Sequence, residues 1–211
     1  MTYLTKMKNP LIVFLILFQV TFAQKSDNYK LDRDYFLLGT LAGRCKDPME
    51  VDLVEKYNQY EDTLIQFSYK LYKGEYDLQV SEHRLISKEL TEKINSFYNW
   101  EYNENFSNEN LDSIFIGTID TTKIKTDSQK ISFLIGAFTR FGKKNDAIYS
   151  INGKSSVENF KIYGKFLKDL RCNEIREVIV EAVGPTLTVY FQPSDRLKKY
   201  LTYYIPNPRD Y

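Results

Sequence analysis

The sequence predicts an α+β protein in which a mainly helical N-terminal half packs on a C-terminal unit of order ββαββ, whose sheet is antiparallel or mixed. Three observations lead to this prediction. Residues 24–102 contain apolar side chains at helical spacing behind two capping motifs. Near the C-terminus, EIREVIVEAV and TLTVYF flank a Gly-Pro pair and have the composition of a β-hairpin. Between the halves, residues 103–112 are rich in Asn and Glu, as is typical of a linker.

Residues 1–23 have the pattern of a secretory signal peptide. Lys6 and Lys8 supply positive charge, an apolar run (LIVFLILFQV) follows, and Ala23 ends a small-x-small motif that predicts cleavage before Gln24. The apolar run is shorter than the ~20 residues that span a bilayer comfortably. We therefore expect a secreted or periplasmic mature protein with no stable membrane span after cleavage. An uncleaved membrane anchor is the alternative.

The chain has two cysteines, Cys45 and Cys172, and both lie in the expected mature part. In an oxidising compartment such a pair is expected to be bridged, and the spacing fits neither a redox CxxC motif nor a metal site. The bridge would close a loop of 172 − 45 = 127 residue steps, for which the chain-entropy model gives roughly 4–5 kcal/mol. We therefore predict a structural disulfide that holds the two halves together.

Residues 31–44 (LDRDYFLLGTLAGR) fit two interpretations. Either Asp32 or Asp34 caps a short helix that ends at Gly43, or the run is a strand with a close backbone approach at Gly39. The sequence leaves this choice open.

Residues 47–74 are predicted as one long helix, because a capping-box pattern begins at Asp47 and Gly74 provides a stop. Its apolar face consists of Leu53, Tyr57, Tyr60, Leu64, Phe67 and Leu71. Apolar side chains also alternate over residues 64–80, so a hairpin is the alternative there. A further helix, capped by Ser87, is predicted over residues 88–100, with Trp100 at its end as a core side chain that joins the two halves.

The C-terminal half, residues 113–204, is predicted to begin with a strand at residues 113–119. Residues 130–142 (KISFLIGAFTRFG) are apolar on both faces in the middle, which favours a central strand covered on each side. The remaining expected elements, in chain order, are a strand at 147–151, a helix from Ser155 to Leu170, a hairpin of 174–183 with 186–191, and a helix at 194–203 before a loosely held tail at 205–211. In the last strand, Leu187, Val189 and Phe191 are expected on the buried face.

The charge balance argues against one class of function. The chain has 29 basic and 28 acidic residues, and loss of Lys6 and Lys8 with the leader leaves a net charge of 27 − 28 = −1. Nucleic-acid-binding proteins usually carry a strongly basic face. We therefore expect no nucleic-acid partner.

The sequence contains no complete motif for catalysis, for a cofactor or for a metal. Gly153-Lys154-Ser155 has the last residues of a phosphate-loop pattern, but the glycine required five residues earlier is Ile148. We interpret these residues as a turn followed by a helix cap. His83 is the only histidine, so no pair of imidazole ligands exists, and no GxSxG motif supplies a serine nucleophile for it.

The leading hypothesis is a non-catalytic binding or envelope-associated module, without a cofactor, whose partner is a protein, a peptide or a glycan. The 17 Tyr and 14 Phe residues would fit an adhesive surface, but composition bias is the preferred explanation, because Lys, Asn, Ile, Tyr and Phe are all abundant together. The alternative is a small extracytoplasmic hydrolase that uses a carboxylate pair. Its candidate residues, which the sequence does not rank, include Glu50, Asp52, Asp120 and Glu181.

Overall fold

The computed structural model describes residues 29–41, 44–46, 50–102, 115–154, 157–180 and 186–204. The chain divides into two compact units, residues 1–30 and 31–211, and every helix and strand below belongs to the second unit. The described residues form six α-helices, ten strands and a short 3₁₀ helix. This composition confirms the predicted α+β class.

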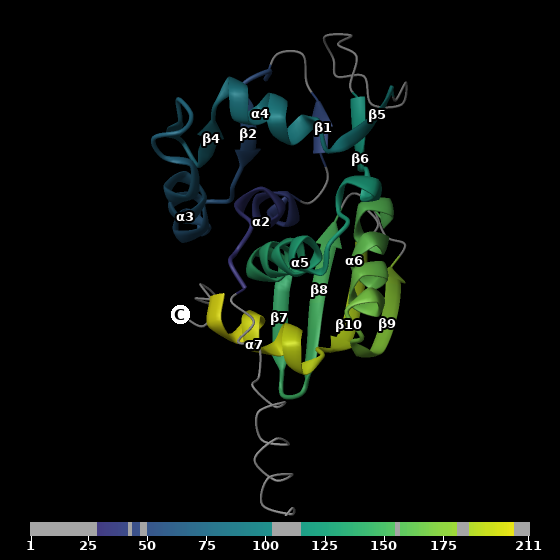
Figure 1. Cartoon of the computed structure of the whole chain (residues 1–211). Coiled ribbons are helices and arrows are strands. Elements are labelled where there is room, and N and C mark those ends of the chain that lie inside the picture. The colour runs from purple at the N-terminus through teal and green to yellow at the C-terminus, as the bar shows by residue number, and fades with distance from the viewer. Residues whose placement is uncertain are drawn as a thin grey trace, which may run out of the picture. The chain divides into compact units, whose positions relative to one another are not determined.

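The elements follow one another along the chain as shown in Figure 1. Those of the first part are α2 (Arg33–Thr40), β1 (Arg44–Lys46), β2 (Leu53–Lys56), α3 (Asp62–Tyr72), β3 (Gln79–Ser81), β4 (Arg84–Ile86), α4 (Lys88–Asn95) and β5 (Tyr98–Tyr102). Those of the second part are β6 (Phe115–Ile119), η1 (Thr121–Lys123), α5 (Asp127–Phe141), β7 (Gly142–Asn145), β8 (Ile148–Lys154), α6 (Val157–Asp169), β9 (Asn173–Val180), β10 (Thr186–Gln192) and α7 (Asp195–Tyr204).

The strands form three antiparallel sheets, with orders β1-β6-β5, β2-β4-β3 and β7-β8-β10-β9. The first sheet joins the two parts of the chain, because β6 pairs with β5 and with β1. The predicted linker, residues 103–112, connects β5 to β6 and lies outside the described residues, so it stays a prediction. The N-terminal half has three helices and also five short strands.

A unit of order ββαββ is present as β7, β8, α6, β9 and β10, but its first strand is β7 and not the predicted strand at residues 130–142. Leu187, Val189 and Phe191 on β10 are buried, as predicted, whereas the alternate residues are half-buried on the other face of the sheet. Helix α6 follows β8 as predicted, and α7 follows β10. The sheet is therefore one-sided, with α5 and α6 packed on the face that carries the apolar side chains.

The prediction of a strand over residues 130–142 is wrong, because most of this run belongs to helix α5. Thr126 and Gln129 form a capping box, with the Gln129 amide 3.2 Å from Thr126 Oγ1 and Gln129 Oε1 3.0 Å from the Thr126 amide. An apolar run of this length fits a buried helix as well as a buried strand, and the capping box was the overlooked signal. The expectation that the segment is covered on both sides is correct: residues 131–138 are all buried.

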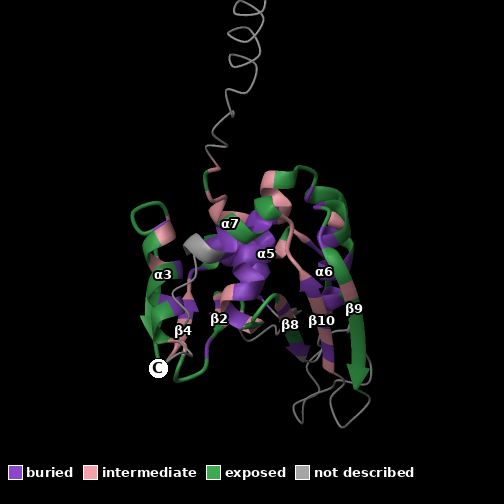
Figure 2. Cartoon of the chain, turned by 90° about the horizontal axis from the view of Figure 1, so that it is seen from below, coloured by how far each residue is buried: buried purple, intermediate pink, exposed green. Residues whose placement is uncertain are grey.

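Helices α2 and α5 cross with their backbones in contact at two glycines. A Cβ atom on Gly136 would lie 2.0 Å from the carbonyl oxygen of Phe36, and one on Gly39 would lie 1.9 Å from that of Phe133. Of the two interpretations of residues 31–44, the helix is correct, with Asp32 as its N-cap. Figure 2 shows α5 as the buried centre of the second unit, with exposed strand β9 at the side.

The prediction of one long helix over residues 47–74 is wrong. Residues 53–56 form strand β2, which pairs with β4, and the helix α3 begins only at Asp62. The alternative hairpin over residues 64–80 is also wrong, because β3 pairs with β4 instead. Between strand and helix, Glu61 accepts a hydrogen bond from the Asn58 amide at 2.7 Å, which closes a turn. In residues 53–56, pairing with β4 outweighs the helical periodicity of the apolar residues. The local sequence does not determine this outcome.

The helix capped by Ser87 is present but shorter than predicted. Ser87 Oγ accepts from the Leu90 amide at 3.4 Å, and α4 ends at Asn95. Trp100 lies in strand β5 rather than at a helix end, against Gly117 of β6 and the ring of Tyr98. It therefore packs within the sheet that joins the two parts of the chain.

We predict that Gly136→Ala lowers the free energy of unfolding by about 1–3 kcal/mol, because the added methyl group forces α2 and α5 apart. Gly164→Ala in α6 is the matched control. Its methyl group would meet only the carboxylate end of the Glu177 side chain, which can move, and alanine favours helix by ~1 kcal/mol. Urea unfolding of both variants measures the difference. A Gly136→Ala variant as stable as the Gly164→Ala variant would contradict the close helix crossing.

Candidate functional site

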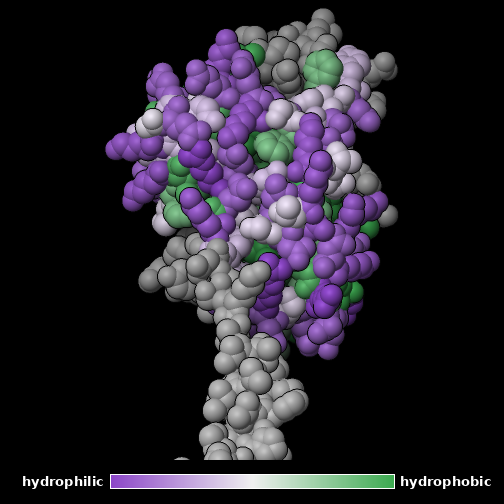
Figure 3. Space-filling view, in the orientation of Figure 1, coloured by the Kyte–Doolittle hydropathy of each residue, from purple (hydrophilic) through white to green (hydrophobic). Residues whose placement is uncertain are grey.

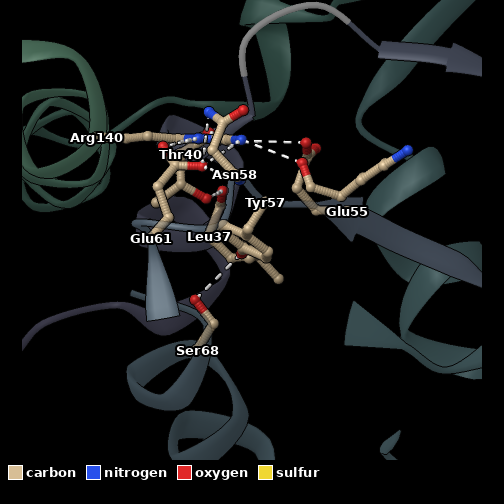
Figure 4. Close-up of polar contacts among 9 residues, drawn as sticks. Leu37, Thr40, Glu55, Tyr57, Asn58, Glu61, Ser68 and Arg140 are labelled. Carbon is tan, nitrogen blue, oxygen red and sulfur yellow. Dashed lines mark hydrogen bonds and ion pairs between the residues drawn. The ribbon is translucent and has the colours of Figure 1, made fainter. Parts of the chain in front are cut away.

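The most highly connected polar group of the described residues is the guanidinium of Arg140 on α5 (Figure 4). Its side chain is 7% exposed, and Nη1 lies 3.2 Å from Glu55 Oε1 while Nε lies 3.1 Å from Glu61 Oε1. Nη1 also donates to the Thr40 carbonyl at 2.8 Å. Nη2 donates to the Lys56 carbonyl at 3.3 Å and to Glu61 Oε2 at 3.2 Å. These contacts use the whole donor set of an arginine.

The surroundings of Arg140 keep it charged. Burial by itself lowers the pKa of Arg140, but Glu55 and Glu61 together raise it above the ordinary value. The guanidinium also lies 4.9 Å from the ring centre of Tyr57, whose pKa burial raises to about 12, with the nearby Glu55 adding to the effect. The protein itself supplies the hydrogen-bond partners and the compensating charges of the buried Arg140 cation. We therefore interpret this group as a structural ion cluster that joins α5 to α2, β2 and α3.

Of the acidic residues singled out in the sequence, the three that the structure describes each have a local contact of their own. Glu50 lies 3.0 Å from Arg84. Asp120 caps η1, where hydrogen bonds from Thr122 lower the pKa of its carboxyl group. The main-chain carbonyl of Asp52 accepts hydrogen bonds from the Ser87 amide and the Thr91 hydroxyl group. Glu181 lies outside the described residues. The structure instead brings Glu55 and Glu61 together, and it does so around Arg140.

His83 lies in the turn between β3 and β4, in a left-handed backbone conformation with φ of 61°. Its Nδ1 is 2.8 Å from Asp62 Oδ1, but the two side chains are 41% and 69% exposed. Water competes with a contact of this exposure and weakens it. We attribute the contact between His83 and Asp62 to the position of the turn between β3 and β4.

Gly153 and Asn152 lie within strand β8, so the predicted turn at this position is wrong. A Cβ atom on Gly153 would lie 1.8 Å from the ring of Phe160, which means that the glycine lets α6 pack directly on the strand. Ser155, the predicted cap, lies outside the described residues. The backbone here forms a ladder with β10 and not an arc of amides around a phosphate.

Cys172 is buried between α6 and β9, and burial raises the pKa of its thiol although hydrogen bonds with Ser194 oppose this. The backbone of Cys45 belongs to β1 and pairs with Ile116. The Cys45 side chain is outside the described part of the chain. The predicted bridge between the two cysteines is therefore untested and stays a prediction.

The second face of the sheet β7-β8-β10-β9 carries a cavity of about 400 Å³, lined by Ile148, Glu174, Ile175, Arg176 and Tyr190. These residues come from β8, β10 and β9, at the end of the sheet near the β7–β8 turn. Arg176 is the cross-strand neighbour of Tyr190, and its guanidinium lies 5.0 Å from the ring centre. The cavity therefore combines apolar walls with one acid, one base and a phenol.

A β-bulge shapes this cavity. Arg176 pairs with Tyr190 and Asn173 with Gln192, so two residues of β9, Glu174 and Ile175, lie opposite a single residue of β10. Glu174 has φ of 50°, a left-handed conformation that is unusual for a residue other than glycine. Bulges are frequent on edge strands and re-aim side chains, and this one brings Glu174 and Ile175 to the cavity.

On the face of the molecule seen in Figure 3, described hydrophilic side chains predominate and apolar ones form small separate groups. Within the described ranges, no group of three or more His, Cys, Asp or Glu residues is arranged to hold a metal ion. The helices of the described part are all too short or too polar to cross a membrane.

Comparison with known proteins finds no relative. The chain matches no protein-family model, no curated protein and no solved structure.

The sequence indicated parts of the cavity but not the site as a whole. The alternation of β10 placed Tyr190 on the face opposite the core, as observed. The bulge in β9, which brings Glu174 and Ile175 to the cavity, leaves no mark in the β-branched pattern of that strand. The sequence patterns do not single out Arg140, because it lies near the end of an apolar run that predicts a strand. The one local signal is the presence of a single arginine in such a run.

We predict that Arg140→Met lowers the free energy of unfolding by about 3–5 kcal/mol, because Glu55 and Glu61 remain in a largely buried site without their cation. The control is Arg196→Met, which removes an exposed pair with Asp127 and is expected to change stability by less than ~1 kcal/mol. Urea unfolding measures both. Equal effects of the two substitutions would show that the buried cluster does not stabilise the fold.

We predict that, once the protein is reduced, the Cys172 thiol reacts slowly with iodoacetamide in the folded state and rapidly in denaturant. The residue is 9% exposed and its raised pKa leaves little thiolate at neutral pH. Mass spectrometry of the alkylated protein counts the labelled thiols. Rapid labelling of the folded, reduced protein would contradict the burial of Cys172, and labelling in denaturant without a reductant would contradict the predicted bridge to Cys45.

Proposed function

We propose that the protein is a non-catalytic binding module that holds a saccharide unit of a glycan in the cavity between β8, β10 and β9. The observation that carries the proposal is the composition of that cavity: Tyr190, Glu174 and Arg176 at apolar walls supplied by Ile148 and Ile175. A volume of about 400 Å³ lies within the range of small-molecule sites. Such sites are mainly apolar with a few polar groups that orient the ligand.

The chemistry of the cavity favours a sugar over an apolar or a singly charged ligand. A sugar ring has an apolar C–H face, which suits the aromatic and aliphatic walls, and hydroxyl groups that both donate and accept hydrogen bonds. Glu174 offers acceptor oxygens and Arg176 offers donors, so the two together match neighbouring hydroxyl groups. Their opposite charges leave the cavity without a strong preference for a cation or an anion.

A hydrolytic role for the same cavity has less support. A glycosidase needs two carboxyl groups about 5–10 Å apart, and Glu174 is the one acid among the residues that line this cavity. Glu55 and Glu61, the acids that do meet, each have Arg140 as a partner. The observations therefore favour retention of the ligand over its cleavage.

We predict that Tyr190→Ala and Arg176→Ala each weaken saccharide binding at least ~10-fold, about 1.4 kcal/mol, because each removes a wall or a donor of the cavity. An array of bacterial and animal oligosaccharides identifies the best probe, and titration calorimetry with that oligosaccharide measures the affinities. Tyr60→Ala is the control, since Tyr60 is 71% exposed in the loop before α3.

Three results would contradict the saccharide proposal. One is a wild-type protein that binds no oligosaccharide on the array but binds extended peptides. Another is equal loss of affinity in the Tyr60→Ala control. The third is release of shortened sugars from the bound oligosaccharide, which would favour the hydrolase alternative.

We further propose that the module acts outside the cytoplasm, secreted or in a periplasm, after removal of residues 1–23. The support is the charged and apolar pattern of the leader described above. We predict an intact mass that begins at Gln24 for protein recovered from the medium or the periplasm of an expressing cell. Ala23→Asp, which replaces the small residue at the cleavage site, is expected to retain the leader. A protein that keeps residues 1–23 without this substitution would contradict the proposal.

A further inference from the structure

Strand β9 presents an apolar edge that the described residues leave exposed. It is the outer strand of the sheet β7-β8-β10-β9, so one side of its backbone faces away from β10. Val178, Ile179 and Val180 are 37%, 47% and 53% exposed, and Figure 2 shows β9 exposed along most of its length. Exposed apolar edge strands recruit further strands, and proteins that remain monomeric usually protect them with charge or proline. These three residues include neither.

The charges on β9 decide in which register a second copy of the strand can pair with this edge. Glu174, Arg176 and Glu177 occupy its first part, and the apolar residues occupy its end. Two copies of the strand related by a two-fold axis perpendicular to the sheet pair antiparallel, and one residue then lies opposite itself at the axis. An axis at Arg176 or Glu177 would set like charges directly against each other, which is destabilising.

An axis at Val178 avoids that conflict. Val178 then faces its own copy, Arg176 faces Val180 of the second copy, and Glu177 faces Ile179. The apolar residues are covered, and the long side chains of Arg176 and Glu177 lie over apolar neighbours with their charged ends in water. Among the described residues of β9, an axis at Ile179 pairs residues 178–180, whereas an axis at Val178 pairs residues 176–180.

We propose that β9 is the interface of a symmetric dimer, in which a second copy of this chain pairs antiparallel with β9 and Val178 lies on the two-fold axis. The two four-stranded sheets then continue into one sheet of eight strands. A two-fold interface of this kind closes on itself and covers the edge that would otherwise recruit further chains.

The dimer also places both cavities on one face of the continuous sheet, since the axis is perpendicular to the sheet. This consequence rests on the proposed saccharide function. It implies that a branched or repeating glycan is held at two points and gains affinity from the link between them. The dimer itself is tested without any ligand, so its failure and the failure of the saccharide proposal are distinguishable.

Sedimentation equilibrium of the wild type, Val178→Lys and Val80→Lys tests the interface. Val80 is the matched control, because it is also 37% exposed on the outer strand of a sheet, β3 of β2-β4-β3. At ~100 μM, where a dimer with micromolar Kd is populated, we expect dimers for the wild type and for Val80→Lys and monomers for Val178→Lys. Circular dichroism establishes that each variant is folded. A monomeric wild type, or a dimeric and folded Val178→Lys variant, would overturn the proposal.

Val178→Cys tests the register independently of any loss of folding. Residues that face each other across an antiparallel pair have Cα atoms about 4.5–5.5 Å apart, which suits a disulfide. We expect this variant to form a covalent dimer under mild oxidation on a non-reducing gel, and the wild type and Val80→Cys to form none. Absence of the covalent dimer in a variant that sediments as a dimer would place the interface elsewhere.

Discussion

The contact on which the second unit depends is the crossing of α2 and α5 at Gly39 and Gly136. The two backbones approach so closely that a methyl group on either glycine would meet a carbonyl group of the other helix. Close approach lets α5 bury its apolar residues all round, with α2 on one side and α6, α7 and the four-stranded sheet on the others. A helix buried in this way joins α2 of the first part of the chain to the four-stranded sheet of the second part (Figure 1).

The same helix carries the buried charge of the fold. Arg140 follows the glycine contact by one turn and reaches the main chain of α2 and β2 and the carboxylates of Glu55 and Glu61. Burial of a charge is costly unless it is paired and fully hydrogen-bonded, so the cluster specifies one arrangement of these elements more than it adds net stability. Its acids are occupied by this task, which is why a pair of neighbouring glutamates does not by itself indicate catalysis.

The two faces of the four-stranded sheet differ, because one belongs to the core and the other carries the cavity that we propose binds a saccharide. One face supplies Leu187, Val189 and Phe191 to the core, whereas the other carries Tyr190 and the cavity. The bulge at Glu174 and Ile175 separates the two parts of β9: the cavity at its beginning and the apolar edge at its end. A saccharide and a second copy of the chain can thus use neighbouring parts of one strand. Side chains on the face of the sheet would contact the saccharide, whereas backbone groups at the edge would pair with the second copy.

The sequence by itself determined the α+β class, the strand, helix and hairpin order from β8 to β10, the helix cap at Ser87 and the buried face of β10, because caps and alternation are local signals. Only the tertiary structure decided that residues 130–142 are mostly helix and that residues 53–56 are a strand. In both runs the local pattern fits two elements, and the surrounding elements select one. The Arg140 cluster and the cavity each consist of residues that are distant in sequence. Spacing along the chain does not show which of these side chains meet in the folded protein.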